Sequence, residues 1–391
     1  MSKVLLGVCG IGHGHSFRQT PILQALIQNG HQVSIFGFGQ SIKYFNQKFP
    51  QIPANETWVP FIHGSKTGID FAKTATESFN TISNTYEINY SAMSKAVDQL
   101  GGEPDLIISD YEPIAAQMAY AVRKPLITID QQSKYLGYDF EELDGLSHLE
   151  ETGRLNLFFP KAKARIACSF FDVNGETVSD DPVQIVSPMI RDQIRAVKTE
   201  RNHNTTGDVV VYLSSYSFFV QKPDELLDEL SRVSEKKFHV FCVNPEAYYP
   251  LLDENSNVRI YRTGDPSFET LLKTAESVIC TGGHNLISEL MYLSIPAYVV
   301  PLGTFEQHYN AHMVGQNGFG VKKDKITADE VREFLKDKSL YHENIINDTH
   351  VLMRGQGEPQ IMDIINKSVT PLFDMEKTSF FSKPKFPERH L

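Results

Sequence analysis

The sequence lacks several features that mark particular classes of protein. No stretch approaches the roughly 20 consecutive apolar residues that a membrane-spanning helix needs, and the N-terminus carries no apolar segment of signal-peptide length. The cysteines are few and no two share a spacing typical of metal-binding motifs; they are Cys9, Cys168, Cys242 and Cys280. We therefore expect a cytoplasmic protein with buried, reduced thiols and no transmembrane segment.

Basic residues are also fewer than acidic residues. Aspartate and glutamate together number 48 and lysine and arginine 37, which gives a formal net charge of −11. A nucleic-acid-binding protein needs a basic face, so this balance argues against a nucleic-acid partner. The triplet Asp-x-Asp, which can hold a divalent ion, is missing as well. We predict no metal site and no cofactor.

What is present is the composition of an ordinary globular protein. Hydrophobic residues make up 41% and aromatic residues 11% of the 391 positions, which excludes a disordered chain. This length predicts two domains, each large enough for its own core. Charged and polar residues without apolar alternation fill 191–206, so we interpret that stretch as a linker. We expect domains at 1–190 and 207–370, followed by a tail at 371–391.

The stretch 277–320 has the clearest pattern in the chain. A short apolar run at 278–280 is followed by Gly282 and Gly283 and then by a helical pattern of apolar residues. A second apolar run at 297–300 leads into a polar set at the start of another helix. Strand, glycine turn, helix, strand and helix in this order are typical of a βαβ unit in a parallel sheet.

The loops of this unit have the chemistry of an anion and sugar site. Glycines between a strand and a helix let backbone N–H groups approach an anion, and the helix N-terminus adds partial positive charge. We predict a phosphate site at 282–285, a ribose contact at Glu289, and sugar contacts at Glu306 and Gln307. The alternative is an ordinary βαβ unit with a capped helix and a solvated face. The glycine turn, the acid on the helix, the polar pair and the βαβ order all fall within so short a stretch that together they favour an anion and sugar site over an ordinary βαβ unit.

The strand–helix–strand pattern at 3–36 contains a second candidate site. Residues 10–16 read GIGHGHS directly after an apolar strand, and open α/β sheets place their sites at this carboxyl edge. The third glycine falls wrongly for a dinucleotide fingerprint and no acid ends the second strand, so NAD is not expected. We predict that His13 and His15 are functional, whereas Arg18 either meets an anion or faces solvent.

Asp110 directly follows another buried strand pattern, at 104–109. Because the carboxyl ends of parallel strands share one edge, Asp110 can lie beside His15. It can equally be only the cap of the helix that follows. Gln131 and Gln132 end the next strand near the same edge.

Together these residues resemble a known family. GGHNLISE, followed by two prolines, Glu-Gln and Asn-Ala, resembles the nucleotide-sugar signature of the GT-B glycosyltransferases. Within them the chain is most similar to the branch that contains the peptidoglycan N-acetylglucosamine transferase and the UDP-glycosyltransferases. The resemblance implies an α/β fold of two Rossmann-like, doubly wound domains facing a central cleft. It also implies donor contacts at Gly282, Gly283, His284, Asn285, Glu289, Glu306 and Gln307.

The same resemblance implies roles for further residues. His15 matches the catalytic histidine, and Asp110 matches an aspartate that orients it. Further donor contacts are expected from the loop that ends at Phe268, which would hold the base, and from Ser214 or Ser215 at the end of a strand. His13 and Arg18 are then expected beside the acceptor, although His13 has no firm counterpart, and Thr281 replaces a histidine of the plant members.

The implied activity is an inverting, metal-independent transfer of a sugar from a nucleotide diphosphate sugar, with UDP the expected carrier, to an acceptor hydroxyl. The acceptor is a glycan, a lipid-linked group or a small molecule. One alternative is a non-hydrolysing UDP-N-acetylglucosamine 2-epimerase, for which the first domain shows no convincing set of acids. Another is a nucleotide-sugar-binding protein without catalysis, which would have no use for His15 and Asp110. The tail at 371–391 either packs on the first domain or touches a membrane surface, so peripheral contact with the inner membrane face stays open.

Overall fold

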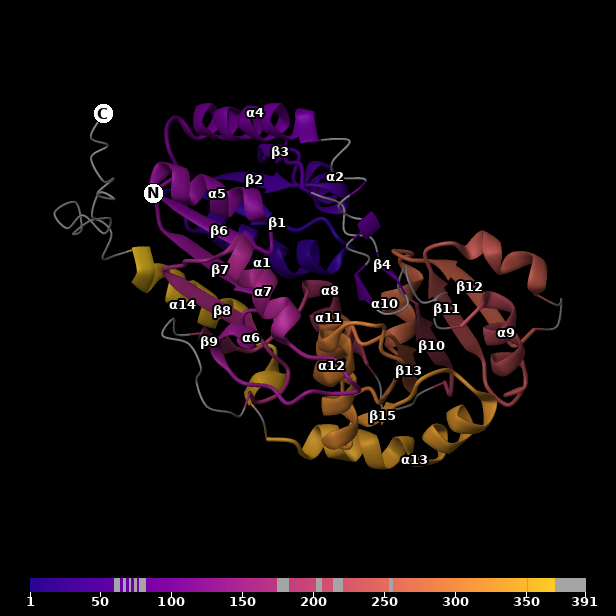
Figure 1. Ribbon diagram of the computed structural model, residues 1–391. Helices are drawn as coiled ribbons and strands as arrows, with labels where there is room; N and C mark the ends of the chain where they lie inside the picture. Colours follow the sequence, from indigo (N-terminus) through magenta and orange to yellow (C-terminus); the bar gives the residue numbers. More distant parts are fainter. Residues whose placement is uncertain are drawn as a thin grey trace, which may run out of the picture.

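The chain builds two parallel sheets, each flanked by helices (Figure 1). This is the predicted fold class of two Rossmann-like domains, which is confirmed. The computed structural model describes residues 1–59, 64–65, 68–69, 72–73, 76, 82–173, 183–201, 206–213, 221–252, 256–349 and 351–369.

The first sheet lies on the left in Figure 1 and has the strand order β3-β2-β1-β6-β7-β8-β9, with every neighbouring pair parallel. Its central strands are short apolar runs that are buried throughout, as strands covered by helices on both faces must be. The strands are β1 (Lys3–Val8), β2 (Gln32–Gly37), β3 (Ala54–Glu56), β6 (Leu106–Asp110), β7 (Leu126–Asp130), β8 (Ala164–Cys168) and β9 (Val183–Val186).

Helices cover both faces of this sheet. One face packs against α1 (Gly14–Gln28), and the other packs against α4 (Ile82–Leu100), α5 (Pro113–Val122) and α7 (Leu149–Phe158). The remaining elements of this part are α2 (Gly39–Lys48), the short α6 (Lys134–Gly137), and the small antiparallel pair β4 (Gly64–Ser65) and β5 (Gly68–Ile69).

The second sheet has the order β12-β11-β10-β13-β14-β15 and is also parallel throughout. Its strands are β10 (Val209–Tyr212), β11 (Phe238–Cys242), β12 (Val258–Arg262), β13 (Ser277–Cys280), β14 (Ala297–Val299) and β15 (Gly320–Lys322). Its helices are α9 (Pro223–Ser231), α10 (Ser267–Leu272), α11 (His284–Leu293), α12 (Phe305–Gln316) and α13 (Ala328–Asn347), with single 3₁₀ turns at Pro245–Ala247, Tyr249–Leu251 and Val351–Arg354.

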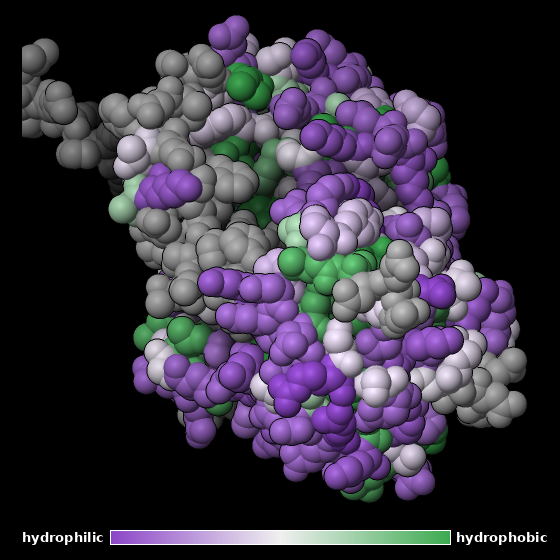
Figure 2. Space-filling view, turned by 90° about the vertical axis from the view of Figure 1, so that its right-hand side faces the viewer, coloured by the Kyte–Doolittle hydropathy of each residue, from purple (hydrophilic) through white to green (hydrophobic). Residues whose placement is uncertain are grey.

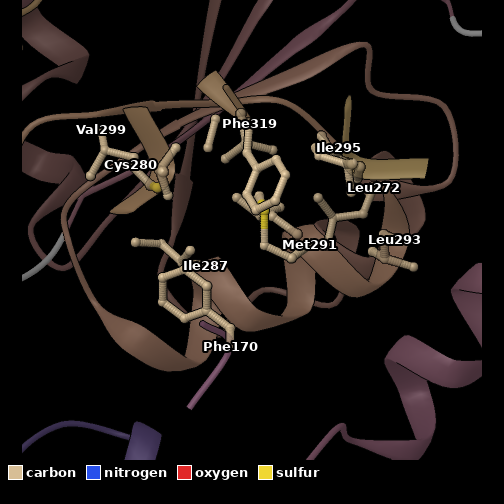
Figure 3. Close-up of a cluster of buried hydrophobic side chains, with 14 of the residues drawn as sticks. Phe170, Leu272, Cys280, Ile287, Met291, Leu293, Ile295, Val299 and Phe319 are labelled. Atoms are coloured by element: carbon tan, nitrogen blue, oxygen red, sulfur yellow. The ribbon is translucent and has the colours of Figure 1, made fainter. Parts of the chain in front are cut away.

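One buried cluster fixes the position of α11 against this sheet. Figure 3 shows Ile287 and Met291 of α11 beneath the strands that carry Cys280 and Val299. Phe170, which follows β8 of the first sheet, belongs to the same cluster and lies beside Ile287. The first half of the chain therefore contributes to the core of the second, close to the N-terminal end of α11.

Two segments that join the sheets differ from expectation. The stretch 191–206, expected as a linker, contains α8 (Asp192–Glu200), whose Ile194 and Val197 are buried in the core of the second sheet. The expected second domain, 207–370, includes α14 (Gly357–Val369), yet Ile361 and Ile365 of this helix pack in the core of the first sheet. The chain therefore returns to the first sheet at α14. The tail at 371–391 lies outside the described residues.

Polar side chains dominate the face shown in Figure 2, which lies over the right-hand side of Figure 1, and hydrophobic residues appear there only in small groups. This agrees with the net charge of −11 and with apolar side chains gathered in the cores around both sheets. Among the residues that the structure describes, no helix is both long and apolar enough to cross a membrane.

Candidate active site

The carboxyl ends of β1, β6 and β7 face the N-terminal ends of α11 and α12, and hydrogen bonds join the two sides. Asn285, in the first turn of α11, donates from Nδ2 to the carbonyl oxygen of Gly14 over 2.7 Å. Gln131 and Gln132, just after β7, donate to the two carboxylate oxygens of Glu306 over 2.6 and 3.2 Å. The predicted histidine loop and the predicted donor loops therefore meet at one interface.

Asp110 is the centre of a buried polar network on the first-sheet side of this interface. Its carboxylate is fully buried and lies 2.8 Å from Nδ1 of His15. Arg18 donates to both carboxylate oxygens, over 3.0 and 2.6 Å, and Gln19 donates over 3.0 Å. Burial raises the pKa of Asp110, but Arg18 and His15 outweigh it and lower the pKa to about 2.

The same network sets the tautomer of His15. An ionised carboxylate only accepts hydrogen bonds, so Nδ1 of His15 donates to Asp110 and its Nε2 is left for a substrate. Burial lowers the pKa of His15, but the charges of Cys9 and Asp110 raise it further than burial lowers it. Asp110 is thus placed to stabilise an imidazolium at His15.

Arg18 and His13 occupy different environments from those expected. Arg18 is buried, and its guanidinium donates to Asp110 and, over 3.3 Å, to the side-chain amide oxygen Oδ1 of Asn285. It is therefore a support of the network, not an exposed contact for an acceptor. The ring of His13 stacks on Phe17 with 5.6 Å between centroids, and burial lowers its pKa. The sequence does contain a sign that Arg18 belongs to this network. Arg18 lies three residues after His15, a spacing that puts both side chains on the same face of a helix.

The two glycines before α11 do different things. A Cβ on Gly282 would lie 2.4 Å from the backbone oxygen of Gln307, so this glycine allows the first turn of α12 to approach closely. Its carbonyl oxygen also accepts from Asn310 over 2.9 Å. Among the residues that the structure describes, no atom lies within 4 Å of a Cβ on Gly283, which is the residue before α11. The open position needed for a ligand is therefore at Gly283.

His284 and Gln307 are partly committed to the protein itself. His284 is buried, and burial, with smaller contributions from the charges of Lys134 and Arg18, holds its pKa well below the ordinary value. It is a neutral imidazole whose Nε2 has no partner among the described residues. Gln307 accepts a hydrogen bond at Oε1 from the backbone of Leu302 over 3.0 Å, which leaves its amide N–H groups for a ligand.

Glu289 has a partner that the sequence pattern did not indicate. Arg191, immediately before α8, donates to both of its carboxylate oxygens over 2.6 and 2.8 Å and to Glu269 over 3.1 Å. The Arg191 guanidinium also lies over the ring of Phe17 in α1, 4.6 Å from its centroid. Arg191 therefore ties the segment between the sheets to Glu289 on one side and to the helix of His15 on the other.

Three further predicted donor residues have different outcomes. Phe268 is buried in the core of the second sheet, where its ring packs against Tyr212 and Phe241 with centroids 5.3 and 5.2 Å apart. Its ring is used by the protein, and the predicted contact of its loop with the donor base, which the resemblance assigns largely to backbone groups, stays a prediction. Ser214 and Ser215 lie outside the described residues.

Comparison with known proteins agrees with this arrangement. Residues 2–338 match the family described as Glycosyl transferase family 1. A curated relative, the UDP-N-acetylglucosamine–N-acetylmuramyl-(pentapeptide) pyrophosphoryl-undecaprenol N-acetylglucosamine transferase of Rickettsia felis, is 23% identical over 94% of this chain and 100% of its own length.

Solved structures share the fold. The kitacinnamycin glycosyltransferase superposes with a TM-score of 0.61 at 14% identity, covering 94% of this chain and 98% of that one. The MurG protein of Acinetobacter baumannii superposes with a TM-score of 0.56 at 16% identity, covering 94% of this chain and 100% of that one. The chain belongs to glycosyl transferase family 1 and is a GT-B glycosyltransferase similar to the MurG branch.

Proposed function

We propose that this glycosyltransferase moves a sugar from a nucleotide diphosphate sugar, with UDP as the carrier, to an acceptor hydroxyl, with inversion and without a metal ion. The observation that supports it most is the pair His15 and Asp110, 2.8 Å apart, placed beside the tip of α11 through the contact between Asn285 and Gly14. A base on one domain then faces an anion-binding helix end on the other. The Rickettsia relative, whose name states a UDP-sugar donor, supports the choice of UDP.

In the proposed step the acceptor oxygen forms a bond to the anomeric carbon while the bond from that carbon to the diphosphate oxygen breaks. The acceptor proton goes to Nε2 of His15, and the leaving electron pair goes to the diphosphate. Asp110 stabilises the imidazolium that results. A single displacement of this kind inverts the anomeric configuration.

The second domain would hold the donor. The N-terminus of α11 offers backbone N–H groups and partial positive charge at Gly283 to the diphosphate, whose charge grows as the bond breaks. Glu289 would accept from the ribose hydroxyls, and Glu306 and Gln307 would contact the sugar. Since the sequence has no Asp-x-Asp triplet, protein dipoles and cations are proposed to stabilise the leaving group in place of a metal ion.

The test combines a donor panel with a base variant. UDP-, dTDP- and GDP-sugars are incubated with glycan, lipid-linked and small hydroxyl acceptors, with and without EDTA, and the anomeric configuration of the product is read by NMR. We expect turnover with a UDP-sugar, inversion, and no effect of EDTA. His15→Ala should lower kcat by about 10²–10⁴-fold with a small change in donor KM.

A matched control for that variant is His31→Ala, since His31 lies just before β2 at the opposite end of the sheet. Product with retained configuration, loss of activity in EDTA, or turnover of His15→Ala within a few fold of the wild type would each contradict the corresponding part of the proposal.

A further inference from the structure

Lys134 is a fully buried lysine at the interface and has no hydrogen-bond partner for its ammonium among the described residues. It begins α6, three residues after Gln131. Its Nζ lies 5.2 Å from the ring centroids of both Tyr135 and Phe171. An ammonium held this way keeps cation–π contacts but lacks the hydrogen bonds that it would have in water. Burying it without a ligand is therefore unfavourable for the stability of the fold.

The segment that carries Lys134 is docked onto the first turn of α12. Glu306 accepts from Gln131 and Gln132, and the ring of Tyr135 packs edge-on against Phe305 with centroids 5.5 Å apart. These contacts fix the backbone on both sides of Lys134. Glu306 makes no close contact with the Lys134 ammonium among the described residues, although its charge opposes the lowering of the pKa of Lys134 by burial.

A second line of contacts leads from Lys134 to the tip of α11. Phe171, under the ammonium, packs against Phe170 with centroids 5.0 Å apart, and Phe170 packs against His284 at 5.3 Å. Burial lowers the pKa of His284, and the charge of Lys134 lowers it further, which agrees with this proximity. His284 Nε2 likewise has no partner among the described residues. One unsatisfied buried atom, Nε2 of His284, thus lies at the start of α11, and the unsatisfied ammonium of Lys134 is linked to it through the rings of Phe171 and Phe170.

An anion is the ligand that satisfies this set. Lys134 supplies a positive charge and donors, and the N-terminus of α11 supplies backbone N–H groups. Burial lowers the pKa of Lys134 to about 8, while Glu306, Cys168 and Asp130 oppose the decrease. The side chain therefore remains mainly cationic at neutral pH.

We propose that Lys134, contributed by the first domain, binds the sugar-linked phosphate of the donor and stabilises the charge that this phosphate gains as the glycosidic bond breaks. The inference rests on the proposed function and adds to it a catalytic residue. Contact between the domains would then be needed for the reaction, because the first domain supplies the cation for the leaving group and the second supplies the helix N-terminus.

The experiment compares nucleotides that differ by this one phosphate. Binding of UDP and UMP to the full chain is measured by titration calorimetry for the wild type, Lys134→Met and Lys134→Gln. Loss of a charged hydrogen bond to the second phosphate should weaken UDP binding by about tenfold or more and leave UMP binding within about twofold. Lys43→Met, which changes an exposed lysine on α2, is the matched control.

Thermal unfolding checks the fold of the variants. Methionine replaces an unsatisfied buried ammonium with an apolar chain of similar length, so we expect an unchanged or raised Tm. Equal affinities of wild type and both variants for UDP would overturn the role of Lys134 while leaving the proposed function intact. A lower Tm with UDP and UMP weakened alike would make Lys134 a structural residue, and a wild type that binds neither UDP nor dTDP would overturn the proposed function as well.

Discussion

The side-chain amide of Asn285 donates a hydrogen bond to the carbonyl oxygen of Gly14 over 2.7 Å. Asn285 lies in the first turn of α11 and Gly14 is the residue before His15 at the start of α1, so the start of α11 rests directly on the start of α1. Arg18 holds the other end of the same amide by donating to Oδ1 of Asn285. The relative position of base and helix tip is therefore set by small polar contacts at a glycine.

A methyl group at Gly14 should disturb this contact without harming the fold. A Cβ there would lie 2.7 Å from Nδ2 of Asn285, while alanine at the start of a helix is as good as glycine or better for stability. We expect Gly14→Ala to lower kcat by about tenfold or more, since small displacements of reacting groups have large effects, with an unchanged Tm. Steady-state kinetics and thermal unfolding test this.

Gly153→Ala is the control for that variant. Gly153 lies within α7, and no atom within 4 Å would meet its Cβ. This change should raise the free energy of unfolding by roughly 0.5–1 kcal/mol and leave kcat unaltered. If Gly14→Ala were as active as Gly153→Ala, the contact between Asn285 and Gly14 would not matter for turnover.

Asp110→Asn should move the pH profile of the reaction. A general base acts when it is unprotonated, so the rate rises with pH through the pKa of His15. Burial lowers that pKa, while Cys9 and Asp110 raise it to a net value above the ordinary one. Removal of the Asp110 charge should therefore shift the rising limb of kcat to lower pH by about one unit or more, with a lower plateau. A limb at the same pH in both proteins would show that His15 is not the titrating base.

The sequence predicts the sheets well and their long-range polar contacts poorly. A short apolar run bounded by turns identified a strand such as 126–130 because burial on both faces leaves an apolar signal along the strand. The pairing of Arg191 with Glu289 joins residues 98 positions apart, and no local pattern records such a distance. In α8 the buried pair Ile194 and Val197 sits among charges, so an amphipathic helix was taken for a linker.

The site residues follow the same division. The proximity of His15 and Asp110 was predictable because Asp110 ends β6 and His15 begins the helix that follows β1, the neighbour of β6 in one sheet. The environment of the Phe268 ring was not predictable, since an aromatic residue in a loop pattern gives no sign of whether its ring faces a ligand or a core. Here Tyr212 and Phe241 take it into the core.

The pair of Arg191 and Glu289 should stabilise the protein and orient the carboxylate for the donor. Arg191→Met would leave a carboxylate that is 8% exposed without its bidentate partner, which costs about 3–5 kcal/mol of unfolding free energy for a buried pair. Donor KM should rise as well. In the double variant Arg191→Met with Glu289→Gln, much of the stability loss should return, because no unpaired charge is left. Urea unfolding of the wild type, the two single variants and the double variant measures the coupling free energy between Arg191 and Glu289. Strictly additive losses of unfolding free energy would contradict that coupling.

Glu112 should make the protein less stable as pH rises. Its carboxylate is fully buried at the N-terminus of α5, where it accepts from the backbone of Ala115 over 2.6 Å and from Thr57 over 3.0 Å. Burial raises its pKa to about 7, and these hydrogen bonds oppose the rise only in part. Between the unfolded pKa near 4.5 and about 7, the folded state holds a proton that the unfolded state has lost.

The unfolding free energy contributed by Glu112 therefore falls as pH rises through that window, by roughly 3 kcal/mol in all. Glu112→Gln removes the titration yet keeps both contacts, because the amide oxygen can accept from Ala115 while the amide nitrogen donates to Thr57, whose hydroxyl then donates to the carbonyl oxygen of Gly37. Urea unfolding at pH 5 and pH 8 should show a smaller decrease for the variant than for the wild type. Parallel decreases in the two proteins would mean that Glu112 is already ionised in the folded protein, and that its cap is made by a charged carboxylate.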